Sequence, residues 1–247
     1  VAPGNDIFLA VGDLMGHTTK AQNYEDGGEP DATGGVLRMN KDGQPLKNGY
    51  LGDEYPLNLY YAYGIRNSFG LDFDPVTGNL WDSENGPDFA DEINLVSPGF
   101  NSGWKDVQGI WEHKGGKPLN VMSNPSELAE FNGKGKYSEP EFTFFNTVGV
   151  TAIKFFDSNK YGLEYRNDLF VGDFKNGDIY HFDLNLDRKS LILDGYLTDK
   201  IANTPEELDG LRFAVGFSGI TDLEVGPDGY LYVLTYGKGT IYRIVPI

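Results

Sequence analysis

The sequence lacks cysteine altogether, and its 247 residues include only three histidines and 20 basic residues against 37 acidic ones. Without cysteine, the chain can form neither disulfides nor thiolate-ligated zinc sites. A formal net charge of −17 repels nucleic acid and anionic lipid, which excludes both as main partners. No apolar run approaches the length of a membrane-spanning helix, so no membrane insertion is expected. Phosphate-binding Gly-Lys-Ser/Thr loops and Gly-x-Ser-x-Gly nucleophile motifs are missing as well.

Short segments rich in Val, Ile, Phe, Tyr and Leu recur along the whole chain, separated by Gly, Asn, Asp and Pro. Many short apolar segments with turn residues between them are typical of an all-β sandwich, barrel or propeller. The predicted strands are residues 7–11, 35–39, 71–73, 79–81, 152–156, 168–172, 178–182, 220–225, 230–234 and 240–245.

One strand–turn–strand phrase occurs three times, beginning at residues 71, 153 and 223. Pro presets φ for such turns, and Gly or Asn supplies the positive φ of a tight hairpin. A unit of this kind cannot bury both of its faces, so the units are expected to stack around an axis. The repeat therefore predicts a β-propeller of four-stranded antiparallel blades.

We expect a single domain over residues 1–247, with two short helical segments at 204–207 and 126–131. Residues 105–139 are rich in Gly, Lys, Asn and Pro and predict a long loop-bearing insertion. The chain opens directly on a strand pattern, so the domain is expected to be N-terminally incomplete. Because missing blades would expose strand edges, another chain or segment is expected to complete the propeller.

Three phrases in the middle of the chain resemble the glucose/sorbosone dehydrogenase family. They are Tyr-Gly-Ile-Arg-Asn-Ser-Phe-Gly-Leu from residue 63, Ser-Glu-Asn-Gly-Pro-Asp-Phe-Ala-Asp-Glu-Ile-Asn-Leu from residue 83, and Gly-Phe-Asn-Ser-Gly-Trp from residue 99. The resemblance implies a six-bladed propeller, of which about four and a half blades are present. It also implies a secreted, periplasmic or cell-surface location, bound Ca²⁺, and oxidation of an aldose sugar by the quinone cofactor PQQ.

The resemblance assigns roles to residues in three groups. The cofactor-binding residues are Arg66, Asn67, Lys175, Thr147 and Phe145. The substrate-contacting residues are Asp13, His17 and Gln22. The metal-binding residues are Gly86 and Pro87, whose carbonyls would hold Ca²⁺, with the acidic pair Asp91 and Glu92 beside them, of which Glu92 resembles a ligand of a second Ca²⁺.

Each assignment has a structural alternative that the sequence leaves open. Arg66 suits a carboxylate or quinone oxygen, but it could instead pair with a nearby acid such as Asp72. Gly86 and Pro87 could form an ordinary turn, and Asp91 and Glu92 a solvated acid pair. The remaining assignments have a plain alternative, a residue in an ordinary loop or strand. This applies to Lys175, His17, Thr147 and Phe145.

The sequence departs from the family pattern at two important places. The general-base histidine of the family would precede Val1, so no catalytic residue is expected in this chain. The Arg-x-Arg-Asp phrase that holds PQQ carboxylates is Gly-Ile-Thr-Asp here, at residues 219–222. Losing two charge-assisted partners should cost several kcal/mol of affinity for an anion.

Two functions follow from these observations. The first is a PQQ- and Ca²⁺-dependent aldose dehydrogenase acting on a small sugar, or a part of one. The second is a non-catalytic, Ca²⁺-stabilised propeller that binds glycans or proteins outside the cell. A Ca²⁺-dependent hydrolase of the lactonase type has only the acidic loops in its favour.

Overall fold

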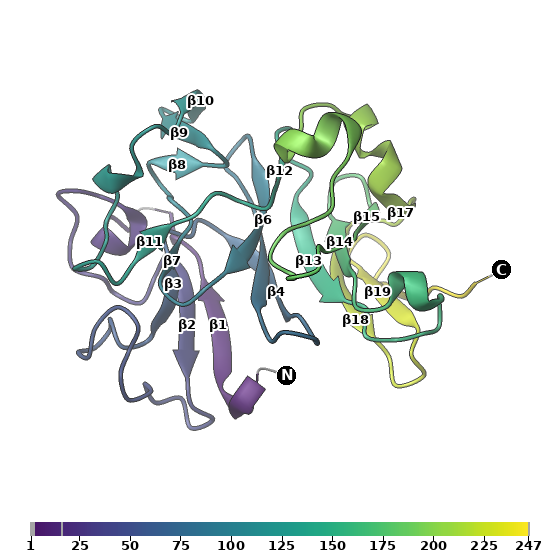
Figure 1. Ribbon diagram of the computed structural model, residues 1–247, viewed down its shortest axis with the longest axis horizontal. Helices are drawn as coiled ribbons and strands as arrows, with labels where there is room; N and C mark the ends of the chain where they lie inside the picture. Colours follow the sequence, from purple (N-terminus) through teal and green to yellow (C-terminus); the bar gives the residue numbers. More distant parts are fainter. Residues whose placement is uncertain (1–2, 16, 247) are drawn as a thin grey trace. The chain divides into compact units, whose positions relative to one another are not determined.

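The computed structural model describes residues 3–15 and 17–246, and these residues are mostly β (Figure 1). The chain divides into two compact units. The first comprises residues 1–68, 86–89 and 96–140, and the second comprises 69–85, 90–95 and 141–247. The single domain expected from the sequence stays a prediction.

The main sheet of the first unit has five strands in the order β1-β2-β3-β7-β11. They are Ile7–Val11, Gly35–Met39, Tyr60–Tyr63, Phe100–Asn101 and Lys136–Tyr137. The first three pair antiparallel, whereas β7 pairs parallel with both β3 and β11. The prediction of a purely antiparallel, four-stranded blade is therefore wrong for this sheet. The two extra strands are only two residues long, and long connections bring β7 alongside β3 and β11 alongside β7.

The segment predicted to be a loop-bearing insertion carries a small antiparallel sheet of its own. Its strands are β8 (Val107–Gln108), β9 (Trp111–Lys114) and β10 (Lys117–Val121), in the order β10-β9-β8. Gly115 and Gly116 have φ values of 61° and 79° and form the turn of the β9–β10 hairpin, which only glycine adopts readily. The helical segment predicted at 126–131 is only a 3₁₀ turn, η3 (Pro125–Glu127).

Three sheets make up most of the second unit. The first has the order β16-β12-β6-β5-β4 and the second β13-β14-β15-β17, while β18, β19 and β20 form an antiparallel meander. The strands are β4 (Ser68–Phe73), β5 (Leu80–Glu84), β6 (Asp91–Val96), β12 (Phe142–Phe144), β13 (Val150–Phe155), β14 (Leu169–Asp173), β15 (Ile179–Phe182), β16 (Ile201–Ala202), β17 (Arg212–Ala214), β18 (Ile220–Val225), β19 (Leu231–Thr235) and β20 (Thr240–Arg243).

The strands predicted from apolar patterning agree with these elements to within a few residues at each end. The second sheet is the four-stranded antiparallel arrangement that the repeat predicts. The helical segment predicted at 204–207 is η6 (Pro205–Leu211), a 3₁₀ helix with Thr204 as its N-cap. The other 3₁₀ segments are η1 (Pro3–Asn5), η2 (Lys20–Gln22), η4 (Leu163–Tyr165) and η5 (Gly195–Asp199).

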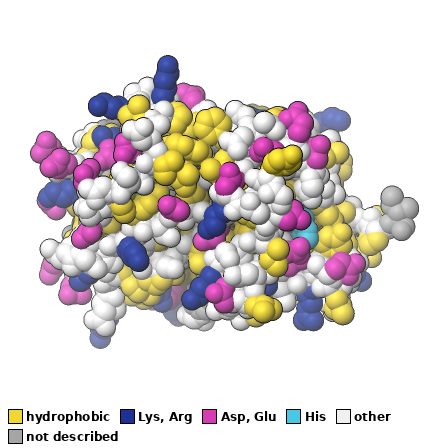
Figure 2. Space-filling model, turned by 45° about the horizontal axis from the view of Figure 1, so that its top comes forward, with side chains coloured by type: hydrophobic (Ala, Val, Ile, Leu, Met, Phe, Trp, Pro, Cys, Tyr) yellow, Lys and Arg dark blue, Asp and Glu magenta, His cyan; other side chains and the backbone are white. Residues whose placement is uncertain are grey.

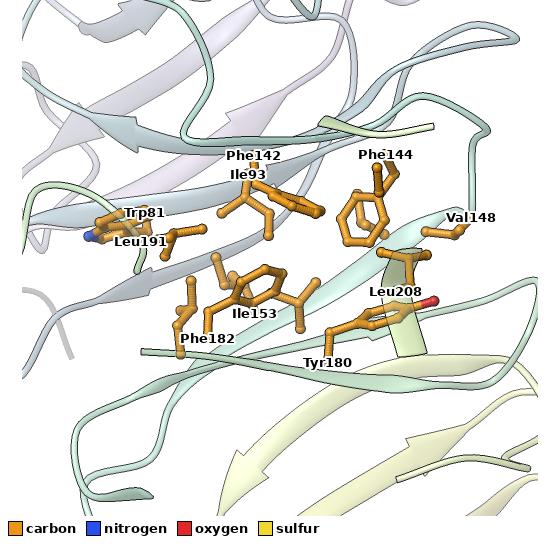
Figure 3. Close-up of a cluster of buried hydrophobic side chains, with 14 of the residues drawn as sticks. Trp81, Ile93, Phe142, Phe144, Val148, Ile153, Tyr180, Phe182, Leu191 and Leu208 are labelled. Atoms are coloured by element: carbon orange, nitrogen blue, oxygen red, sulfur yellow. The ribbon is translucent and has the colours of Figure 1, made fainter. Parts of the chain in front are cut away.

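An aromatic core lies between two of the sheets of the second unit (Figure 3). Phe142 on β12 packs against Phe182 on β15, with ring centroids 5.1 Å apart. Phe144 packs against Tyr180 in the same way at 5.2 Å. All four side chains are almost completely buried. Burying the facing sides of two sheets against one another is how stacked β units are stabilised.

Across residues 3–15 and 17–246, the strands form separate open sheets, and they show no closed propeller. None of the helices described is long and apolar enough to cross a membrane. Acidic side chains are scattered over the face drawn in Figure 2, as the net charge of the sequence leads one to expect.

Candidate functional site

The Gly-Ile-Arg-Asn phrase and the Gly-Phe-Asn-Ser-Gly-Trp phrase meet in the first unit. Asn23 and Asn101 form a reciprocal pair, each amide nitrogen donating to the other's carbonyl oxygen at 2.9 Å. Gly64 has a φ of 68°, and a Cβ at this position would lie 1.9 Å from Asn101 Oδ1. Glycine is therefore required here by both backbone conformation and space. Asn23, which the sequence did not single out, joins the two phrases.

Trp104 links two of the predicted site residues, Asp13 and Arg66. Its Nε1 donates a hydrogen bond to Asp13 Oδ2 at 3.1 Å. The Arg66 guanidinium carbon lies 5.5 Å from the centroid of a Trp104 ring, within the range of a cation–π contact. The backbone amide of Asp13 donates to the Arg66 carbonyl at 2.9 Å. A carboxylate and a guanidinium are thus held on one indole, with Asn67 directly after Arg66.

A row of rings continues from Trp104 toward the predicted metal loop. The His113 ring centroid lies 4.9 Å from Trp104 and 5.9 Å from Phe89, which follows Gly86 and Pro87 closely in the sequence. His113 Nδ1 bonds the Lys105 carbonyl at 2.9 Å. Its Nε2 is buried, and no partner for it exists among the described residues. Sequence patterning did not point to the contacts of His113, because this residue belongs to the insertion predicted as a loop.

Gln22 is completely buried, and its amide is fully engaged. Its Nε2 donates to Thr33 Oγ1 at 3.1 Å and to the Asp13 carbonyl at 3.3 Å, while its Oε1 accepts from the Thr19 amide at 3.2 Å. These bonds hold the loop that carries Asp13. They explain why Gln22 is buried in this position without invoking a substrate. Its contact with a substrate stays a prediction.

His17 lies in an exposed part of the same loop, where its Nδ1 is 2.6 Å from Asp31 Oδ2. Asp31 also accepts from the hydroxyl and the amide of Thr33, at 2.6 Å and 3.1 Å. Burial would raise the pKa of Asp31, but the bonds from Thr33 and the nearby His17 outweigh it and lower that pKa. Asp31 therefore orients the His17 ring, and the sequence had not identified this partner.

The second unit brings together Lys175, Thr147 and Asp91. The Lys175 ammonium donates to Thr147 Oγ1 at 2.5 Å and to the Thr147 carbonyl at 2.9 Å. Asp91 is buried, and its Oδ2 accepts from the amides of Val148 and Gly149 at 2.8 Å and 2.6 Å. A buried carboxylate thus fixes the loop that receives the lysine. Phe145 begins this loop, and its backbone bonds Ala90 and Ala202.

Asp173, at the end of β14, holds the turn that carries Lys175. Its Oδ1 accepts from the amides of Asn176 and Gly177 at 2.6 Å and 2.9 Å, and its Oδ2 accepts from the Tyr180 hydroxyl at 2.7 Å. Burial raises the pKa of Asp173, and these donors oppose that rise because they favour the charged carboxylate. The position of Lys175 is therefore set by buried groups on both sides of the turn.

Strands β5 and β6 bury four carboxylates, each no more than 1% exposed. They are Asp82, Glu84, Asp91 and Glu92. Glu92 Oε2 accepts from Asn94 Nδ2 at 3.1 Å. Carboxylate oxygens are ligands that Ca²⁺ prefers, so these residues are of a suitable chemical type for it. Asp82 and Glu84 were not among the predicted ligands, because the sequence alone does not reveal that they are buried.

A cavity of about 130 Å³ adjoins the Lys175 loop within the second unit. Thr147 and Asn176 line it from the loop side, and Thr204 and Arg212 line it from the η6 side. Arg212 is fixed by its Nε, which donates to Asp178 Oδ2 at 2.8 Å.

The phrase that replaces Arg-x-Arg-Asp begins before β18 and ends inside it. Ile220 is buried, and its carbonyl accepts from Thr151 Oγ1 at 2.5 Å. Burial raises the pKa of Asp222, the Leu223 amide lowers it, and the neighbouring Glu224 raises it further. Two arginines in this phrase would lower the pKa of Asp222. The electrostatic environment of this strand therefore differs from the one that the family pattern implies.

The fold of this chain is similar to part of the propeller fold of glucose and aldose sugar dehydrogenases. The aldose sugar dehydrogenase of Escherichia coli is 29% identical over 245 residues, which are 97% of this chain and 57% of that protein. The apo crystal structure of the soluble aldose sugar dehydrogenase from Escherichia coli has a TM-score of 0.64 and is 25% identical, over 94% of this chain and 58% of that one.

The PQQ-bound structure of aldose sugar dehydrogenase from Streptomyces coelicolor has a TM-score of 0.62 and 19% identity, over 97% of this chain and 56% of that one. The family model for glucose/sorbosone dehydrogenase matches residues 1–243, and the chain therefore belongs to this family. The chain spans less than two thirds of the length of these relatives.

Proposed function

We propose that the chain is part of a PQQ- and Ca²⁺-dependent aldose dehydrogenase with a six-bladed propeller. The observation that carries this proposal is the positioning of Lys175. Its ammonium is held on a turn fixed by Asp173 and against a loop fixed by Asp91. A lysine held in place on an exposed loop is suited to binding a carboxylate, and PQQ carries three of these.

In the first unit, Arg66 offers a second positioned cation beside Asn67. Its contact with Trp104 restricts the orientation of the planar guanidinium, a group suited to bidentate binding of a carboxylate or quinone oxygen. Asp13 accepts from the same indole and is the residue that we propose to contact the sugar. When bound, PQQ supplies the hydride acceptor for oxidation of the sugar.

Calcium is the second group for which the residues are suitable. The carbonyls of Gly86 and Pro87, in the first unit, and the carboxylate of Glu92, proposed for a second Ca²⁺ in the second unit, are hard oxygen donors, which Ca²⁺ prefers. Asp91 has a different role in the structure, because its Oδ2 binds two backbone amides. We therefore propose that Asp91 supports the cofactor loop and that Glu92 is the better candidate for a metal ligand.

The test is reconstitution of the protein with PQQ and Ca²⁺, followed by an absorbance titration of PQQ binding and dye reduction with glucose. Replacing Lys175 by Met or Arg66 by Ala should weaken PQQ binding about 10- to 100-fold, the usual value of a charged hydrogen bond. Lys189→Met removes an exposed lysine and is the matched control. Unchanged PQQ affinity in both variants would show that neither Lys175 nor Arg66 belongs to the cofactor site.

One observation favours a second function, a non-catalytic module that binds glycans or proteins. The phrase at residues 219–222 lacks both arginines, and the pKa of Asp222 is raised rather than lowered. The absence of the two arginines disfavours an anionic cofactor. No PQQ absorbance change at saturating cofactor, in a protein that still binds Ca²⁺, would support this function. For either function we propose a location outside the cytoplasm and another chain or segment that completes the propeller.

A further inference from the structure

We propose that Asp168, His181 and Asp183 form a binding site for a divalent transition-metal ion, separate from the residues proposed for PQQ and Ca²⁺. One ligand atom from each of the three side chains lies within 4.8 Å of the other two. The set combines an imidazole with two carboxylates, a mixture that suits Zn²⁺ and its neighbours in the first transition row. The site lies entirely within the second unit.

The pairing of β14 with β15 places the three side chains on one face of the sheet. Leu169 pairs with Phe182, and Phe170 pairs with His181. Because side chains alternate between faces, residues 168, 170, 181 and 183 all project from the face opposite to Leu169 and Phe182. The same register continues to place Asp168 opposite Asp183. Like charges at such positions are unfavourable, so a cation between them would remove a local repulsion.

The distances are compatible with a small ion bound by all three groups. His181 Nε2 lies 3.0 Å from Asp168 Oδ2 and 3.8 Å from Asp183 Oδ1. With metal–ligand bonds of about 2.1 Å, these separations correspond to angles of about 90° and about 130° at the ion. Calcium requires six to eight oxygen ligands at longer distances, so a set that contains an imidazole nitrogen selects against it.

The three ligand residues are held before any ion binds. The His181 ring packs against Tyr165 and Phe170, each with a centroid distance of 5.0 Å. The Asp168 carbonyl accepts from the Phe156 amide at 2.9 Å, and the Asp183 carbonyl accepts from the Ile192 amide at 2.8 Å. Backbone and ring positions are therefore fixed, which lowers the conformational entropy that an ion must remove on binding.

The site is open on one side only. The side chains of Asp168 and His181 are 12% and 19% exposed, whereas that of Asp183 is 58% exposed. An ion can enter past Asp183 and keep one or more water ligands there, as in metal sites with three protein ligands. The alternative is that His181 pairs with both carboxylates and the three side chains bind no metal. That arrangement predicts no binding of Zn²⁺.

The experiment is a calorimetric titration of the intact protein with Zn²⁺ at pH 7 in the presence of excess Ca²⁺. We expect a single Zn²⁺ to bind and to raise the melting temperature. Replacement of Asp183 by Asn should weaken this binding at least about 10-fold, by analogy with losses on altering metal-site partners. Co²⁺ as a probe should give a d–d absorption band that changes in the same variant.

Two further variants complete the test. His181→Gln should abolish the Co²⁺ band, and Asp183→Asn keeps the test valid if His181→Gln fails to fold. His17→Gln is the matched control, because His17 and Asp31 form the other close His–Asp pair among the described residues but offer only two ligands. Absence of Zn²⁺ binding, equal affinity in wild type and Asp183→Asn, or displacement of Zn²⁺ by Ca²⁺ would overturn the proposal.

Discussion

Replacing Asp91 by Asn should destabilise the second unit at the loop that receives Lys175. Asp91 is 1% exposed, and its Oδ2 accepts from the amides of Val148 and Gly149. The Asn side chain has nearly the same shape and can still accept both hydrogen bonds through its carbonyl oxygen. It lacks the negative charge, however, and it buries an NH₂ group where a carboxylate oxygen was.

The expected loss of stability in Asp91→Asn follows from these two hydrogen bonds. A hydrogen bond to a charged group contributes about 1.5–3 kcal/mol, and roughly half of this is lost when the acceptor becomes neutral. Two such bonds give a loss of about 2 kcal/mol. For a chain of this size, that corresponds to a decrease of roughly 4–8 °C in melting temperature.

The assay is thermal unfolding combined with hydrogen exchange at the amides of Val148 and Gly149. Both amides should exchange faster in Asp91→Asn, because their acceptor is weaker. The matched control is Asp157→Asn, which removes a charge from an exposed position of the same unit and should change stability by less than about 0.5 kcal/mol. Equal melting temperatures for the two variants, with unchanged exchange at both amides, would refute the reasoning.

Two further predictions concern pH and packing. Burial, together with the nearby Tyr50, raises the pKa of Tyr61 to about 12. The folded state therefore holds this proton more tightly than the unfolded chain, so that stability should be full below about pH 10 and decrease between about pH 10 and 12. Tyr61→Phe should flatten that decrease in urea unfolding curves, and identical curves would count against it. Phe142→Ala should cost about 3–5 kcal/mol, because the ring is fully buried against Phe144 and Phe182. Leu186→Ala, at an exposed position, should leave the same curves nearly unchanged, and an equal loss in both variants would show that the aromatic core is not the source of stability.

The strands that the sequence predicted best are those with a clear apolar pattern and a strong turn. The meander β18–β20 is an example, since Pro227, Asp228 and Gly229 separate two alternating segments. The parallel strands β7 and β11 could not be predicted, because two residues carry no periodicity. The hairpin in the insertion had a signal in Gly115 and Gly116, which the polar composition around them obscured.

For the candidate site, too, the sequence predicted some features and not others. Motif resemblance singled out Arg66, Asp91 and Lys175 as candidates, but it could not supply their contacts. Asp91 binds amides 57 and 58 residues away, and Asn23 pairs with Asn101 across 78 residues. Local patterning carries no information about such separations.

The sequence by itself determined the all-β character, most of the longer strands, the acidic surface and the family. These properties depend on composition and on residues close together in the chain. Only the tertiary structure decided that Asp168, His181 and Asp183 share one face of a sheet and that Trp104 holds both Asp13 and Arg66. Strand register and loop packing set those distances, and both are fixed by the burial of side chains far apart in the sequence.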